Sequence, residues 1–196
     1  MEWVNDVSDT TAQCFFWLSG NLGIGKSAIT ASIAKACKHC RVLWAQFLST
    51  VMALGLLICG CFFPSIAQQM SRSSCAVNYA VQETLKDQLD LMNEDISIDQ
   101  ARGLFVNTIQ VASKSNPTSP VVIVIDALDE TDFKHLADTV KIFSQVVIDL
   151  LHNAKVFISN RAENIIWDVL LLNSLMNVFS TCISQQRIPS QRLWNF

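Results

Sequence analysis

Short apolar runs alternate with segments of helical periodicity along the first part of this chain. Cys14 to Leu18 is apolar on both faces and predicts a short buried strand, and a glycine-rich turn follows it. Lys26 to Cys37 then carries apolar residues at helical spacing, and Val42 to Phe47 predicts a second strand. A strand, a helix and a strand in this span form a βαβ unit, which implies a parallel sheet covered by helices.

The pattern continues with helices and strands after Pro64. Ser97-Ile-Asp-Gln100 matches a capping box, and the apolar residues from Ile98 to Ala112 keep helical spacing. Residues 114–120 form a loop by composition. Val121 to Ile125 is a run of consecutive β-branched residues and predicts a buried parallel strand.

One more helix and one more strand complete the predicted α/β fold. Thr131 to Leu150 predicts a helix, and Lys155 to Ser159 predicts a strand. The inward positions of that helix are Leu136, Val140, Phe143 and Val147. We therefore expect a parallel sheet with helices on both faces, incomplete at its C-terminal edge.

Two stretches fit this pattern less well. Val42 to Ser71 contains no charged residue, and Val51 to Phe63 within it is apolar throughout. The tail from residue 164 to 196 ends without a recognisable element. We interpret residues 1–163 as the domain core, interrupted by an apolar segment at 48–63 that is foreign to the fold. The tail is interpreted as divergent, either truncated or wrongly predicted from its gene.

Composition excludes some function classes. A hydrophobic content of 51% indicates a packed globular chain, and a net charge of −3 gives no reason to expect nucleic acid as a partner. The seven cysteines are odd in number, and the start of the chain lacks a signal-peptide pattern. Cys37-x-x-Cys40 has no second pair at metal-binding spacing, so reduced thiols in a cytoplasmic protein are expected.

A phosphate-binding motif lies between the first predicted strand and helix. Gly20-Asn-Leu-Gly-Ile-Gly-Lys-Ser27 fits G-x-x-x-x-G-K-[ST] at every fixed position. Glycines let backbone N–H groups turn toward a polyphosphate, and the helix adds the positive end of its dipole. Lys26 is expected to reach the β- and γ-phosphates, and the Ser27 hydroxyl to ligate Mg²⁺. The expected nucleotide contacts from this region are Gly20, Asn21, Leu22, Gly23, Ile24, Gly25, Lys26, Ser27 and Ala28.

Three carboxylates lie at the end of the strand that begins at Val121. Asp126 comes first and is the expected Mg²⁺ partner, because ligands of parallel sheets bind at the carboxyl ends of the strands. Asp129 or Glu130 is then placed to orient and deprotonate an attacking water. The alternative is that these acidic residues only cap the following helix. Their combination with the phosphate loop favours the catalytic interpretation.

The spacing of the two motifs indicates which nucleotide and which kind of sheet to expect. The long separation of Lys26 from Asp126 suits NTPases with an extra strand between the loop strand and the acidic strand. The guanine signature Asn-Lys-x-Asp is absent, which favours ATP over GTP. Arg161 follows the last predicted strand and is a candidate sensor of the γ-phosphate, or alternatively a surface residue.

In combination, these motifs resemble a known family. Glu2-Trp-Val, FFWLSGNLGIGKSAITASIA, VVIVIDALDE and KVFISNR resemble the NACHT domain of fungal STAND proteins, of the nephrocystin-3-like N-terminal type. The form D-[GAS]-hydrophobic-D-E is met from Asp126 to Glu130, and the arginine after the fourth strand is met by Arg161. The resemblance implies a switch that ADP holds closed and that ATP opens and oligomerises, with slow hydrolysis resetting it. It also implies effector domains as partners in the full-length family protein.

Two other functional interpretations stay open at this point. The first is a module that binds nucleotide without turning it over. The second is a membrane protein anchored through residues 44–63, a stretch barely long enough to span a bilayer. A span there would place Lys26 and Asp126 on opposite sides of the membrane, although both are expected at one nucleotide, so a membrane partner is disfavoured.

Overall fold

The computed structural model describes most of the regions that the sequence predicts as regular elements. The described residues are 2–5, 14–48, 62–86, 98–127, 143, 153–161 and 179–184. Asp129 and Glu130 therefore lie outside the described residues, as do the inward positions Leu136, Val140 and Val147.

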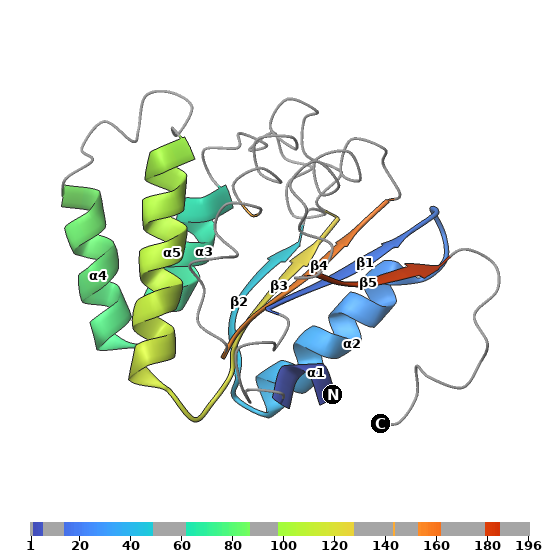
Figure 1. Cartoon of the computed structure of the whole chain (residues 1–196), viewed down its shortest axis with the longest axis horizontal. Coiled ribbons are helices and arrows are strands. Elements are labelled where there is room, and N and C mark those ends of the chain that lie inside the picture. Colours follow the sequence, from blue (N-terminus) through green and yellow to red (C-terminus); the bar gives the residue numbers. More distant parts are fainter. Residues whose placement is uncertain are drawn as a thin grey trace.

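Five parallel strands form one sheet in the order β2-β3-β4-β1-β5 (Figure 1). The strands are β1 (Phe15–Gly20), β2 (Leu43–Leu48), β3 (Val121–Asp126), β4 (Ala154–Asn160) and β5 (Phe179–Ser184). The extra strand that the motif spacing predicts is confirmed, because β4 lies between β1, which leads into the phosphate loop, and β3, which ends at Asp126. The sequence predicts a sheet that is incomplete at its C-terminal edge, and the structure differs, because a fifth strand, β5, pairs with β1.

Helices cover both faces of the sheet, as predicted (Figure 1). One face carries α1 (Glu2–Asn5) and α2 (Lys26–His39). The other carries α3 (Phe62–Ser71), α4 (Cys75–Lys86) and α5 (Ile98–Ser115). The chain therefore has the α/β architecture of P-loop proteins.

The alternation of side chains along each strand divides the core into two clusters. Val121, Ile123 and Ile125 of β3 belong to the cluster under α3, α4 and α5, whereas Val122 and Val124 belong to the cluster under α2. All five are completely buried, which explains why this strand is a continuous apolar run in the sequence. Residues of even number in β3 therefore face α2.

The short helix α1 packs over the start of β4. The Trp3 ring centroid lies 5.6 Å from that of Phe16, and the Nζ of the buried Lys155 lies 5.8 Å from the Trp3 ring centroid. A lysine ammonium within about 6 Å of an aromatic ring centroid is attracted by the negative face of the ring. This contact helps to hold α1 on the sheet. It also gives the buried ammonium group of Lys155 a favourable partner.

The structure corrects the boundaries of the apolar segment predicted at 48–63. Leu48 is the last residue of β2 and pairs with Asp126, so it belongs to the sheet. Phe62 and Phe63 begin α3 and are buried in the larger cluster, where the Phe62 ring centroid lies 4.6 Å from that of Phe47. Residues 49–61 lie outside the described residues, and for them the insertion hypothesis stays a prediction.

The start of the membrane-span candidate also belongs to the sheet. Trp44 lies in β2, which pairs in parallel with β3. Over the residues that the structure describes, none of the helices is long and apolar enough to cross a bilayer.

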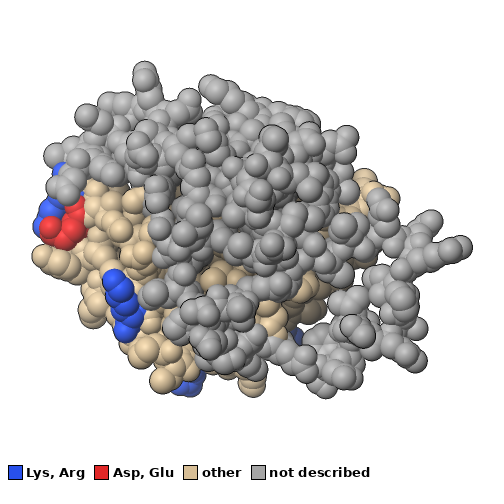
Figure 2. Space-filling view, in the orientation of Figure 1, with Lys and Arg blue, Asp and Glu red and all other residues tan. Residues whose placement is uncertain are grey.

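Figure 2 shows a few separate lysines and arginines among the described residues of one face. Among the described residues drawn there, lysines and arginines do not merge into one continuous patch.

A buried asparagine joins the start of β4 to the end of α5. The Asn153 Nδ2 atom donates to the carbonyl oxygens of Ser113, Asn116 and Ser119 at distances of 3.0 to 3.3 Å. The Asn153 carbonyl accepts the N–H of Val121 at 2.8 Å. The carbonyls of Ser113 and Asn116 also accept backbone N–H groups at 3.2 Å, so Asn153 adds a second donor to each of them and fixes the end of α5 and the turn after it to the sheet.

Replacing this amide is expected to destabilise the fold. Asn153→Ala should lower the free energy of unfolding by roughly 2 kcal/mol, because three side-chain hydrogen bonds between β4 and the end of α5 are lost. Asn116→Ala is the control, since Asn116 is half-buried and its Nδ2 makes a single bond, to the Ala112 carbonyl at 3.2 Å. Urea unfolding followed by circular dichroism measures both variants. Equal losses in the two would contradict a special role for Asn153.

Candidate functional site

The turn between β1 and α2 is shaped by two glycines with left-handed backbones. Gly23 has φ 83° and Gly25 has φ 89°. A Cβ added at either position would meet nothing within 4 Å, so glycine is required here by backbone conformation and not by lack of space. Gly25 is also the N-cap of α2, and its carbonyl accepts the N–H of Ile29 at 3.1 Å. The first N–H groups of α2, which have no partner within the helix, therefore face the loop.

Lys26 folds back over its own loop. Its Nζ donates to the Gly20 carbonyl at 2.7 Å and to the Asn21 carbonyl at 2.9 Å. The side chain is half-buried and lines the cavity beside the loop. A cationic donor is thus already held where an anion could reach it.

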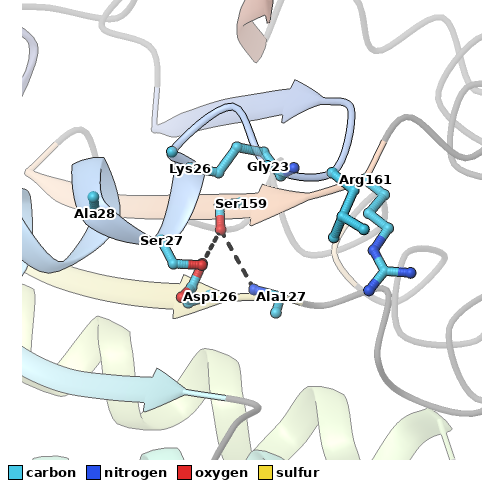
Figure 3. Close-up of a pocket in the computed structure, with 10 residues that line it drawn as sticks. Gly23, Lys26, Ser27, Ala28, Asp126, Ala127, Ser159 and Arg161 are labelled. Atoms are coloured by element: carbon cyan, nitrogen blue, oxygen red, sulfur yellow. Dashed lines mark hydrogen bonds between the residues drawn. The ribbon is translucent and has the colours of Figure 1, made fainter.

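A cavity of about 280 Å³ lies between this loop and the carboxyl ends of β3 and β4. Figure 3 shows Ala28 on one side of it and Arg161 on the other. The lining residues are Leu22, Gly23, Gly25, Lys26, Ser27, Ala28, Asp126, Ala127, Ser159 and Arg161.

Most of the sequence-predicted binding residues are brought together here. Gly20, Asn21 and Ile24 do not line the cavity. Gly20 and Asn21 contribute instead the carbonyls that hold Lys26. Ile24 is 43% exposed.

The polar end of β3 is built around Asp126. The Ser159 hydroxyl donates to Asp126 Oδ1, and the Ala127 N–H donates to the Ser159 oxygen at 3.4 Å (Figure 3). Asp126 is only 6% exposed, so its carboxylate depends on such partners. Ala127, the next residue, has φ 55°, a left-handed conformation that is uncommon for any residue other than glycine.

Arg161 closes the cavity at the end of β4. Its carbonyl accepts the Nδ2 of Asn160 at 2.5 Å, and the Oδ1 of Asn160 accepts the indole N–H of Trp17. Asn160 is 1% exposed and thereby ties the backbone of Arg161 to β1. The Arg161 side chain itself is exposed.

The oxygen donors around the cavity fit a hard divalent cation. The Ser27 hydroxyl lines it from the first turn of α2, and the Asp126 carboxylate lines it from the end of β3. Mg²⁺ is bound in proteins through one or two such oxygen ligands, with water and substrate phosphates completing the shell. Within the described part of the chain, no three His, Cys, Asp or Glu residues gather as an all-protein metal cage.

The Cys37-x-x-Cys40 pair combines one buried and one exposed thiol. Both cysteines are free, and Cys37 is completely buried in the cluster under α2. Burial raises the pKa of the Cys37 thiol to about 11, so it stays protonated at neutral pH. Cys14 and Cys75 are free as well.

The sequence did not identify three of the residues at the site, which are Ser159, Asn160 and Ala127. Ser159 and Asn160 are single polar residues at the end of an apolar strand, without a motif of their own. A polar pair directly before a candidate sensor arginine is the signal that could have identified them. Ala127 stood within the acidic motif without a role, and its positive φ now explains why a small residue lies there.

Comparison with known families agrees with these motifs. The family model described as "Nephrocystin 3, N-terminal" matches residues 1–161. The match ends at the arginine that closes the cavity, and it contains all the residues that line it. No curated protein matches the chain.

The backbone of Ala127 gives a test of local strain beside the cavity. A left-handed conformation costs a residue with a Cβ about 1–2 kcal/mol, so Ala127→Gly should be neutral or stabilising by up to about 1 kcal/mol. Ala127→Val should destabilise by more than about 1 kcal/mol. Ala31→Gly, on the exposed side of α2, is the control and should lose about 1 kcal/mol. Thermal unfolding checks the three changes, and a loss in Ala127→Gly equal to that in Ala31→Gly would refute the strain.

Proposed function

The chain belongs to the nephrocystin 3 N-terminal family, and we propose that it is an ATP-binding, slowly hydrolysing NTPase module of a nucleotide-dependent signalling switch. Family membership supports a NACHT-like nucleotide-binding module. That the nucleotide is ATP, that it is hydrolysed and that the module acts in signalling are proposed here in addition.

One observation carries the proposal. The phosphate loop and Asp126, separated by about half the chain, line one cavity from facing elements. The loop side presents backbone N–H groups, the start of a helix and a lysine, all of which favour an anion. The β3 side presents a carboxylate, which would repel that anion unless a cation lay between them. A magnesium–nucleotide complex supplies both charges at once.

The chain's residues have distinct roles in this proposal. Lys26 exchanges its bonds with the Gly20 and Asn21 carbonyls for bonds to the β- and γ-phosphates. The Ser27 hydroxyl and the Asp126 carboxylate hold Mg²⁺, the latter through water. When bound, Mg²⁺ neutralises negative charge on the phosphate oxygens. Arg161 is positioned at the rim to contact the γ-phosphate.

Hydrolysis needs a base, for which Glu130 is proposed, with Asp129 beside it. Both follow Asp126 in the sequence and lie outside the described residues. The base would orient and deprotonate the water that attacks the γ-phosphorus. A module that binds nucleotide without turnover is the alternative outcome.

The finer biological setting is also a proposal. The motif combination supports a NACHT domain of the fungal STAND type, working in the cytoplasm, in which ADP and ATP favour closed and open states. Self-association and effector domains of a longer family protein are the proposed partners, and nucleic acid is not one. For such a switch to work, ATP must bind the open state more tightly than the closed state, and ADP must bind the closed state more tightly than the open one.

Removing the loop lysine should remove nucleotide binding. Lys26→Ala is expected to weaken ATP binding by roughly 100-fold or more, because charge-assisted hydrogen bonds contribute about 1.5–3 kcal/mol each. Lys35→Ala is the matched control, since Lys35 is an exposed lysine of α2 that does not line the cavity. Calorimetry with ATP and Mg²⁺ measures both, and circular dichroism checks folding. Unchanged affinity in Lys26→Ala would refute the site.

Replacing the proposed base should separate binding from turnover. Glu130→Gln is expected to retain ATP affinity while phosphate release stops, because an amide can still hydrogen-bond water but cannot accept its proton. Single-turnover phosphate release is the measurement, with Asp129→Asn tested beside it. If the unmodified protein binds ATP and releases no phosphate, the binding-only alternative is correct.

A further inference from the structure

Ser159 connects the two strands that end at the cavity. It lies at the penultimate position of β4 and is completely buried. Its hydroxyl donates to Asp126 Oδ1 and accepts the N–H of Ala127 at 3.4 Å (Figure 3). Both functions of the hydroxyl, donor and acceptor, are therefore used on the end of β3.

The backbone of the sheet sets this arrangement. Ile125 pairs with Ile158 in the parallel register of β3 and β4, so Asp126 and Ser159 are the next residues along both strands. Because side chains alternate, Ser159 lies on the same face as Phe157, in the cluster under α2, and Asp126 lies on the same face as Val124. The hydroxyl and the carboxylate thus meet on the side of the sheet from which the phosphate loop emerges.

A hydroxyl in this place restricts the carboxylate. A buried carboxylate without a fixed partner can rotate about its side-chain torsions, and a metal ligand that rotates binds its metal less tightly. Hydrogen bonds from neighbouring groups orient ligating carboxylates, and their loss typically weakens metal binding 10- to 100-fold. The hydrogen bond from the Ala127 N–H to the same hydroxyl also restrains the backbone of Ala127, the left-handed residue that follows Asp126.

We propose that Ser159 is a positioning residue that holds the Asp126 carboxylate in the orientation that Mg²⁺ requires in the nucleotide complex. This inference rests on the proposed function, because it needs a magnesium–nucleotide complex in the cavity. Ser159 contacts neither the phosphates nor the metal; it acts through Asp126. It therefore makes the Mg²⁺ requirement depend on β4, the strand that Arg161 directly follows.

Three substitutions of Ser159 separate the hydroxyl from the volume of the side chain. Ser159→Ala removes the hydroxyl with the smallest possible change in side-chain volume. Ser159→Thr keeps the hydroxyl, and Ser159→Val has the shape of threonine without it. Threonine and valine share any cost of the added volume, so a difference between them reports the hydroxyl. Circular dichroism and thermal unfolding establish that each variant is folded.

The measurement is the Mg²⁺ dependence of nucleotide binding. A fluorescent ADP analogue is titrated with each variant without Mg²⁺ and over a range of Mg²⁺ concentrations. In Ser159→Ala and Ser159→Val, the Mg²⁺ concentration for half-maximal tightening should rise about 10- to 100-fold. The affinity measured without Mg²⁺ should stay within about twofold of the unmodified protein. Ser159→Thr should restore the original Mg²⁺ dependence.

The same substitution made in an Asp126→Asn protein tests whether Ser159 influences Mg²⁺ binding through Asp126. In Asp126→Asn, which lacks the charged ligand, adding Ser159→Ala should change the Mg²⁺ dependence no further. Equal Mg²⁺ dependence in Ser159→Thr and Ser159→Val, or a shift that persists in Asp126→Asn, overturns the inference while the proposed function stands. Unmodified protein that binds no nucleotide overturns the proposed function and this inference with it. A merely structural role of Ser159 would lower the unfolding temperature and leave the Mg²⁺ dependence unchanged.

Discussion

The parallel pairing of β1, β4 and β3 determines where the chemistry of this molecule can lie. Parallel strands end at one edge of their sheet, so the loop after β1, the Ser159–Asn160 pair of β4 and Asp126 of β3 are neighbours whatever the length of chain between them. β4 lies between the other two strands and contacts both. On one face its Ser159 bonds to Asp126, and on the other its Asn160 bonds to Trp17 of β1. Two successive residues therefore tie the edge together from both sides.

The parts of this arrangement that could be predicted from sequence are those that depend on local patterns. Val121 to Ile125 is β-branched throughout because β3 is buried on both faces, and such a run has few other structural solutions. The glycines at 23 and 25 occupy left-handed backbone positions that most residues avoid. The phosphate-loop pattern therefore identified the turn, its helix and the preceding strand together, and the long separation of its two motifs identified the extra strand.

The remaining features depend on contacts between distant residues, which no local pattern encodes. Asn153 is one asparagine near the start of a strand, and its three carbonyl partners lie more than thirty residues before it. Phe62 and Phe63 were assigned to an apolar segment foreign to the fold, because hydropathy alone cannot separate a core phenylalanine from an inserted one. The same holds for Ser159, whose importance comes from the register that places it beside Asp126.

The hydrogen bonds that Lys26 makes to its own loop change what a heat of binding would mean. The ammonium group is paired with the carbonyls of Gly20 and Asn21 at 2.7 and 2.9 Å. A phosphate that binds at the loop therefore competes with these two carbonyl oxygens for hydrogen bonds from the Lys26 ammonium group. The enthalpy released is then the difference between new and old bonds, so a small calorimetric signal would be compatible with a strong lysine–phosphate contact.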